Sequence, residues 1–316
     1  MECGNMSEED YKASLEVEYA EEQSYEFQLR RDGIVAFLDI LGYKHLAETG
    51  SEDVIREVMD VLRQAQNETA KLMPELDLPP DVRSQLVMEV IDDVKLINIS
   101  DSIILHNRFP LVIPFGPEVT KRKRLCDAFV VYRFVTLCQH VWSVLFERGL
   151  PLRGAISVGT FYWNHETIMA GKPFVEAYND SESLSFSGLV LTQDTLSAIH
   201  ERAGILFEED SPFHLTTQEM PVPMKTKSGD RLCSRNVIFP DLPDVPIKKV
   251  ADYARKRFEA HGKKVDSPRV QAILKNTIEI MTSLKCETTN MVSRSELPRS
   301  IVDFSVRMPM DVRVVE

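Results

Sequence analysis

The stretch Ile34–Leu46, IVAFLDILGYKHL, decides the fold of this chain. Its first five residues are all apolar, which predicts a strand that is buried on both faces. Asp39 stands at the inner end of that strand, and the chain then turns through Gly42. A buried carboxylate without a partner costs several kcal/mol. The sequence therefore predicts that a positive charge neutralises Asp39.

A second acid belongs to the next pair of strands. Residues 90–107, VIDDVKLINISDSIILHN, are rich in β-branched side chains and predict two strands joined by a tight turn at 100–102, which carries Asp101. In the predicted sheet this turn can meet the end of the first strand. Two carboxylates brought close together in this way repel each other unless a cation binds between them. Two Mg²⁺ or Mn²⁺ ions would satisfy both acids, so we expect metal rather than a protein cation to neutralise Asp39.

The turn after Asp39 has a possible role of its own. Gly42 has no side chain, so backbone N–H groups in this turn can approach phosphate oxygens closely. The stretch therefore predicts a place for a phosphorylated ligand next to the metal acids.

The order of elements predicts an α+β fold. The pattern β-α-β-β-α-β is that of a ferredoxin-like core, an antiparallel-rich sheet with helices on one face. After residue 107 we expect a helix at 125–148, a strand at 152–159, a hairpin at 161–171, a helix at 172–184, a strand at 188–192 and a helix at 193–200.

Three regions follow from this pattern. Residues 1–28 are acidic and poor in core residues, which is typical of a tail. Residues 29–205 form the predicted catalytic domain. Residues 206–316 form a C-terminal extension packed on the core, for which we expect helices at 246–261 and 267–285 and a half-buried strand at 301–308.

Composition excludes some classes of function. The net charge of −12 argues against general binding to nucleic acid, which needs a basic face, but it allows a nucleotide ligand because bound metal inverts the local charge. We see no apolar run of about 20 residues that would span a membrane, and no signal peptide. Five scattered cysteines without metal spacing favour reduced thiols and a cytoplasmic location.

Four stretches together resemble the class III nucleotidyl cyclases. Phe37–Tyr43 matches their apolar strand followed by Asp, Gly and an aromatic residue, and Ser100–Ser102 matches the hairpin that carries their second metal aspartate. LRGAISVG at 152–159 resembles a later strand, and GKPFVEAYNDSE at 171–182 resembles a later helix. The resemblance covers residues 33–200. The residues of these motifs are most similar to those of the Pycsar pyrimidine cyclases of bacterial anti-phage defence.

The resemblance implies a function and a site. It implies a lyase that converts UTP, or CTP, into the 3′,5′-cyclic nucleotide and pyrophosphate, with the product activating a separate effector protein. It implies a homodimer with its active sites at the interface and two divalent cations, Mn²⁺ or Mg²⁺, per site. The implied metal ligands are Asp39, Asp101 and the backbone carbonyl of Ile40. The implied substrate contacts are Gly42, Tyr43, Arg153, Glu176 and Asn179.

Three positions depart from the purine cyclases of that family. Their base-selecting Lys, four residues before the second aspartate, is replaced here by Ile97. Their transition-state Asn and Arg are replaced by Val175 and Asn179. The metal-binding half of the site is therefore present, whereas the residues that read a purine base are absent.

Alternatives remain open at this point. One is another two-metal enzyme on a similar sheet, such as a palm-type polymerase or a linear-dinucleotide cyclase, but the chain has no GGDEF-like hairpin and no basic template groove. Another is a purine nucleotide cyclase. A third is a degenerate cyclase-like domain that binds a nucleotide and regulates a partner. The sequence does not choose between UTP and CTP, and it does not identify the effector or the activating signal.

Overall fold

The computed structural model describes most of the central part of the chain. The described residues are 31–49, 52, 53, 56, 59, 60, 63, 94–99, 101–109, 117–163, 169–207, 217–227, 229–238 and 245–292. The expected tail at 1–28 and the expected strand at 301–308 lie outside the described residues.

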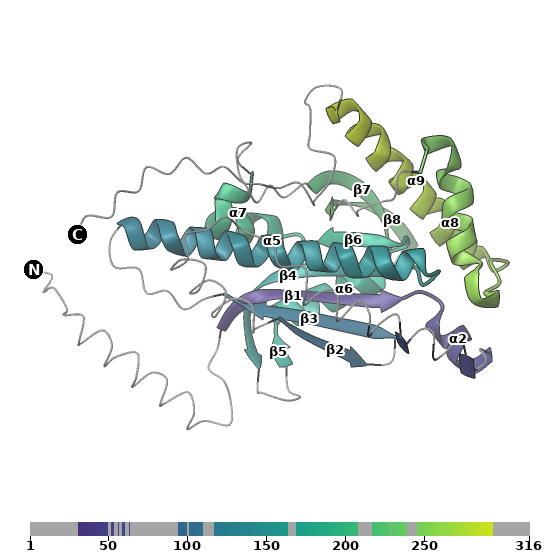
Figure 1. The fold of residues 1–316 in the computed structure, drawn as a ribbon, viewed down its shortest axis with the longest axis horizontal. Helices are drawn as coiled ribbons and strands as arrows, with labels where there is room; N and C mark the ends of the chain where they lie inside the picture. Colours follow the sequence, from purple (N-terminus) through teal and green to yellow (C-terminus); the bar gives the residue numbers. More distant parts are fainter. Residues whose placement is uncertain are drawn as a thin grey trace, which may run out of the picture.

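One mixed sheet forms the centre of the fold (Figure 1). Eight strands belong to it, in the order β2-β3-β1-β4-β6-β8-β7, with β5 paired to β4. Only β4 and β6 run parallel among the described pairs, and the rest are antiparallel. The strands are β1 Arg31–Ile40, β2 Lys95–Ile99, β3 Ser102–Arg108, β4 Leu152–Trp163, β5 Met169–Gly171, β6 Gly188–Leu191, β7 Thr217–Thr226 and β8 Gly229–Ile238. The predicted α+β class with an antiparallel-rich sheet is confirmed.

Helices cover both faces of this sheet. Those of the core are α2 Tyr43–Thr49, α5 Pro117–Glu147, α6 Lys172–Ser183 and α7 Thr195–Ala203. On the face of α5, the side chains of Ile34, Ala36 and Leu38 belong to the main hydrophobic core. On the opposite face, the ring of Phe37 packs edge-on against Tyr178 of α6, with ring centroids 5.1 Å apart. The expectation of helices on one face therefore holds for α5 and α7 and fails for α6.

The reason lies in the composition of β1. A strand with apolar residues on both faces needs cover on both faces, whereas an alternating strand would leave one face to solvent. Ile34, Val35, Ala36 and Leu38 are all fully buried. This arrangement places α6 on the same face of the sheet as Asp39, because side chains two residues apart on a strand point the same way.

The C-terminal extension continues the sheet. β8 pairs with β6, and β7 pairs with β8 at the edge, so the sheet crosses the expected boundary at residue 205. This hairpin was not among the expected elements, and Pro221 and Pro223 weaken the strand pattern of β7. An edge strand tolerates proline, since its outward N–H groups need no partner. The buried Val222 and Met224 show the alternation that marks it.

Two further helices complete the extension. α8 Val250–Phe258 and α9 Pro268–Val292 confirm the expected helices. Glu147, at the end of α5, accepts hydrogen bonds from Tyr253 and Arg257 of α8. The extension is therefore anchored to the core at the end of α5.

One described helix is long and apolar enough to cross a membrane by length and composition. It is Cys126–Glu147 within α5, and most of it is buried in the protein. This corrects the expectation that no apolar stretch reaches spanning length. The apolar side chains are explained by the position of α5 across the sheet, where it forms the core (Figure 1).

Candidate functional site

Strand register brings the two predicted metal acids together. Asp39 of β1 faces Ser102 of β3, so Asp101 lies one position beyond, beside Ile40. The backbone N–H of Ile40 donates a hydrogen bond to the carbonyl oxygen of Asp101 at 2.9 Å. Asp101 is close enough for its charge to raise the pKa of Asp39. The hairpin turn and the strand end therefore form one acidic site.

A protein cation already neutralises Asp39. Arg153 lies opposite Asp39 in the register of β4, and its Nε donates a hydrogen bond to Asp39 Oδ2 at 2.8 Å. The side chains of Arg153 and Asp39 are 5% and 11% exposed. This corrects the expectation that metal rather than a protein cation neutralises Asp39. The sequence could not show it, because the pair depends on strand pairing across 114 residues.

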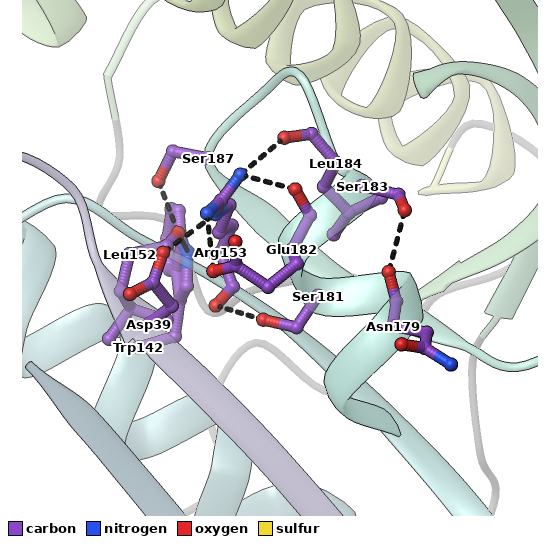
Figure 2. A network of polar contacts seen from close by, with 10 residues as sticks. All are labelled: Asp39, Trp142, Leu152, Arg153, Asn179, Ser181, Glu182, Ser183, Leu184 and Ser187. Atoms are coloured by element: carbon purple, nitrogen blue, oxygen red, sulfur yellow. Dashed lines mark hydrogen bonds and ion pairs between the residues drawn. The ribbon is translucent and has the colours of Figure 1, made fainter. Parts of the chain in front are cut away.

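Arg153 also holds the end of α6 (Figure 2). Its Nη1 donates to the carbonyl oxygens of Glu182 at 2.7 Å and Leu184 at 3.2 Å, and its Nη2 donates to Glu182 Oε1 at 2.8 Å. Each guanidinium nitrogen thus has an acceptor within the protein. Arg153, predicted as a substrate contact, is in this structure a buried bridge between β1 and α6.

The environment of Asp39 affects its ionisation in opposing ways. Burial raises the pKa of Asp39 above its ordinary value, and the positive charge and hydrogen bond of Arg153 lower it. The negative charges of Glu182 and Asp101 raise it further. The net direction is upward and burial is its largest cause, so the ionised form of Asp39 depends on the positive charge beside it.

The turn after β1 has the backbone geometry that glycine provides. Gly42 has a φ of 82°, in the left-handed region that other residues rarely adopt. The N–H of Leu41 donates to the carbonyl of Pro151 at 2.8 Å, which fixes the turn beside the start of β4. A Cβ on Gly42 would lie 3.4 Å from Cδ of Lys263, a residue of the extension. The extension therefore reaches the predicted phosphate turn.

Lys263 is an unusual neighbour for that turn. Its Nζ donates to the carbonyl of Gly149 at 2.6 Å. Burial lowers its pKa from 10.5 to about 8, and no charged neighbour contributes to this shift. The sequence analysis did not select Lys263, because a lysine between two helices carries no local signal of burial.

The other predicted substrate residues are placed differently. Tyr43 is half-buried and packs on the main hydrophobic core. Glu176 accepts a hydrogen bond from Ser157 Oγ at 3.0 Å and pairs with Lys172 at 3.1 Å. Ser157 lies four positions along β4 from Arg153, about 13 Å away. Within one chain, Glu176 is therefore not part of the acidic site.

Asn179 lies on α6 and is exposed. Its backbone carbonyl oxygen accepts a hydrogen bond from Ser183 Oγ at 2.6 Å, and Figure 2 shows the Asn179 side chain apart from the contacts around Arg153. The structure thus brings Asp39, Asp101 and Arg153 together and leaves Asn179 free to contact something outside this site.

Two features of the site were not predicted. Glu182 closes the bridge from Arg153 to α6, and Tyr178 packs on Phe37 beside the acids while staying 48% exposed. Both lie in the helix that the sequence analysis selected. Their contacts come from the packing of α6 on the sheet, which the helical pattern alone does not define.

The donor set fits a magnesium-like ion. Within the described part of the chain, no group of three or more His, Cys, Asp or Glu side chains could hold a metal. Asp39 and Asp101 supply two carboxylates, however, and no described donor binds Asp39 Oδ1. Mg²⁺ usually takes one or two carboxylates and completes its shell with water and substrate phosphates. The residues present therefore fit divalent cations that arrive with a nucleotide.

Comparison with known proteins finds a likeness to cyclases among solved structures. No protein-family model and no curated protein matches the chain. The adenylyl cyclase CyaB from P. aeruginosa is 14% identical, with a TM-score of 0.38, over 69% of this chain and 98% of that chain. The guanylyl cyclase Cya2 is 14% identical, with a TM-score of 0.32, over 68% of this chain and 95% of that chain.

A third solved structure is a class III adenylyl cyclase-like ATP-binding protein from Pseudomonas aeruginosa. It is 20% identical, with a TM-score of 0.35, over 54% of this chain and 35% of that chain. Identities and TM-scores at this level do not assign a function to the chain.

Proposed function

We propose that this chain is a metal-dependent pyrimidine nucleotide cyclase. It would convert UTP, with CTP as the second choice, into the 3′,5′-cyclic nucleotide and pyrophosphate. The observation that carries the proposal is the meeting of Asp39 and Asp101 beside the Gly42 turn, since Ile40 and Asp101 are hydrogen-bonded neighbours. Carboxylates next to a tight glycine turn supply what a metal-bound triphosphate needs.

The reaction is an intramolecular phosphoryl transfer. The ribose 3′-hydroxyl loses its proton to solvent, its oxygen attacks the α-phosphorus in line, the bond to the bridging oxygen breaks, and pyrophosphate leaves with the electron pair of that bond. Bound divalent cations would lower the pKa of the 3′-hydroxyl and neutralise the phosphates. Asp39, Asp101 and the Ile40 carbonyl would hold those cations, and the Gly42 turn would orient the phosphates. Catalysis would therefore be positioning and charge stabilisation.

The preference for a pyrimidine rests on the strip of sheet beside Asp39. Ile97 of β2 faces Ile104 of β3, which faces Phe37 of β1. These apolar side chains lie on the face of α6, next to the acids. The strip Ile97, Ile104 and Phe37 itself offers a purine no specific hydrogen bond, and a smaller base suits a site bordered by Tyr178. Lys95 lies on the same face of β2, two positions from Ile97 and farther from the acids.

We propose in addition that the active unit is a homodimer. Val175 and Tyr178 are 58% and 48% exposed on α6, on the same face of the sheet as the acids. A second copy docked head to tail on this face would bring its own α6 to the acids and enclose the base and ribose. Asn179, which has no role within its own chain's site, would then contact substrate held by the partner.

The biological role follows from the resemblance. The cyclic nucleotide would be a second messenger in cytoplasmic anti-phage defence and would activate a separate effector protein. Neither nucleic acid nor a membrane would be a partner.

The test is a product analysis. The pure protein is incubated with each of the four ribonucleoside triphosphates and Mn²⁺, and products are identified by mass spectrometry. We expect cyclic UMP as the main product. Nucleotide binding without any cyclic product would favour the alternative of a regulatory domain that only binds the nucleotide. The hydrogen bond from Arg153 to Asp39 supports that alternative, because it occupies one oxygen of a proposed metal ligand.

A further inference from the structure

Arg153 and a divalent cation need the same carboxylate. Asp39 Oδ2 accepts the hydrogen bond from Arg153 Nε, and the carboxylate is also the central acid of the proposed metal site. The guanidinium has a second carboxylate available, because Nη2 binds Glu182 Oε1 at 2.8 Å. Arg153 is therefore shared between two acids, and only one of them belongs to the metal site.

The anchoring of Arg153 does not depend on Asp39 alone. The carbonyl oxygens of Glu182 and Leu184 accept from Nη1, so the guanidinium stays at the end of α6 if Asp39 is withdrawn (Figure 2). Glu182 is 44% exposed at its side chain and can adjust, whereas Arg153 is buried. Glu182 and the α6 carbonyls thus give the Arg153 guanidinium acceptors other than Asp39.

From this geometry we infer that Arg153 is an exchangeable counter-ion. In the metal-free chain it neutralises Asp39. When a divalent cation binds Asp39, Arg153 weakens its bond to Asp39, stays on Glu182 and the α6 carbonyls, and turns its freed Nε–H toward the anionic phosphates. This rests on the proposed function, and it concerns which cation occupies Asp39 before substrate arrives.

The sign of the effect follows from charge. A positive charge in contact with Asp39 repels a second cation. Its hydrogen bond also occupies Oδ2 of Asp39, which is then less available as a metal ligand. Removing that charge should therefore tighten the binding of metal to the free protein. A merely structural role for Arg153 predicts the opposite, because a disordered Asp39 would bind metal less well.

The experiment measures binding of Mn²⁺ alone, without nucleotide, by titration calorimetry and by the electron paramagnetic resonance of free Mn²⁺. Arg153→Gln removes the charge and keeps hydrogen-bonding groups for the α6 carbonyls. We expect it to bind Mn²⁺ roughly tenfold more tightly than the wild type. Arg153→Lys keeps the charge and should stay close to the wild type.

Two variants of α6 supply the matched comparison. Glu182→Gln removes the second acid, so Arg153 rests more firmly on Asp39, and Mn²⁺ binding should weaken. Asp180→Asn removes one negative charge from the same helix, but Asp180 pairs with Arg235 at 2.9 Å. Its Mn²⁺ affinity should equal that of the wild type. If Arg153→Gln does not fold, as judged by circular dichroism, a Glu182→Gln affinity equal to that of Asp180→Asn still overturns the exchange.

The outcomes separate the inference from the proposed function. Tighter binding by a folded Arg153→Gln supports the exchange. Equal or weaker binding by a folded Arg153→Gln overturns it, as does a Glu182→Gln affinity equal to that of Asp180→Asn. If no variant binds Mn²⁺ without nucleotide, the exchange is overturned, and the proposed function is decided by the product analysis alone.

Discussion

The backbone N–H of Ile40 donates to the carbonyl oxygen of Asp101 at 2.9 Å, which fixes the hairpin turn against the end of β1. This single bond joins the two segments that carry the acids. The relative position of the Asp39 and Asp101 backbones is thus fixed by the sheet.

The two acids should differ in their effect on stability. Asp39→Ala and Asp101→Ala should each abolish cyclic nucleotide formation, because each removes a proposed metal ligand. Asp39→Ala also removes one of the two carboxylates that pair with the buried Arg153, so we expect it to destabilise the fold by about 2 kcal/mol, because Glu182 still holds the guanidinium. Asp101→Ala removes repulsion and should leave the melting temperature unchanged or higher. Thermal unfolding without metal measures the difference, and equal losses in both variants would contradict the Arg153 pairing.

Removal of metal should stop the reaction reversibly. Activity should vanish in excess EDTA and return when Mn²⁺ or Mg²⁺ is added, because both acids serve oxygen-preferring cations. Product formation is followed by liquid chromatography. Full activity in EDTA would refute the metal mechanism.

Gly42→Ala should disturb the turn and the reaction together. A side chain at a φ of 82° costs about 1 kcal/mol, and the new Cβ would face Lys263 at 3.4 Å. The matched control is Gly229→Ala, at a φ of 106° in the β7–β8 turn with no atom within 4 Å of the new Cβ. Both variants should lose stability in urea unfolding, and only Gly42→Ala should lose substrate affinity.

Lys263 should make stability depend on pH in a defined window. Its pKa is about 8 in the folded protein, against 10.5 as the ordinary value, so the unfolded chain binds more protons between these two pH values. Stability from this group therefore rises as pH rises from about 8 to 10.5 and is constant below that window. The free energy of unfolding of the wild type minus that of Lys263→Met should show this rise. A difference that stays flat would show that Lys263 is not desolvated.

The shared-site dimer can be tested by complementation. Asp39→Ala protein is mixed with a Glu176→Ala, Asn179→Ala double variant, and subunits are allowed to exchange. If α6 of one protomer serves the acids of the other, one site per mixed dimer regains an intact set, so about a quarter of all sites recover. No recovery after proven exchange, or an active monomer by light scattering, would refute the model.

The sequence by itself determined the local elements of the site. Five consecutive apolar residues predicted β1, the β-branched run on either side of Asp101 predicted the β2–β3 hairpin, and Gly42 predicted a turn after β1, which the structure forms with Gly42 at a φ of 82°. These features follow from periodicity and turn chemistry, which act over a few residues. The proximity of Asp39 and Asp101 followed from the same patterns, because neighbouring strands in a predicted topology have few possible registers.

Only the tertiary structure decided what neutralises Asp39. Arg153 stands 114 residues away in the sequence, and its link to Glu182 needs α6 on the face of the sheet opposite α5. The β7–β8 hairpin and the approach of Lys263 to Gly42 also depend on packing between distant segments. A buried charge selects its partner by burial and geometry, and neither of these is a property of the local sequence.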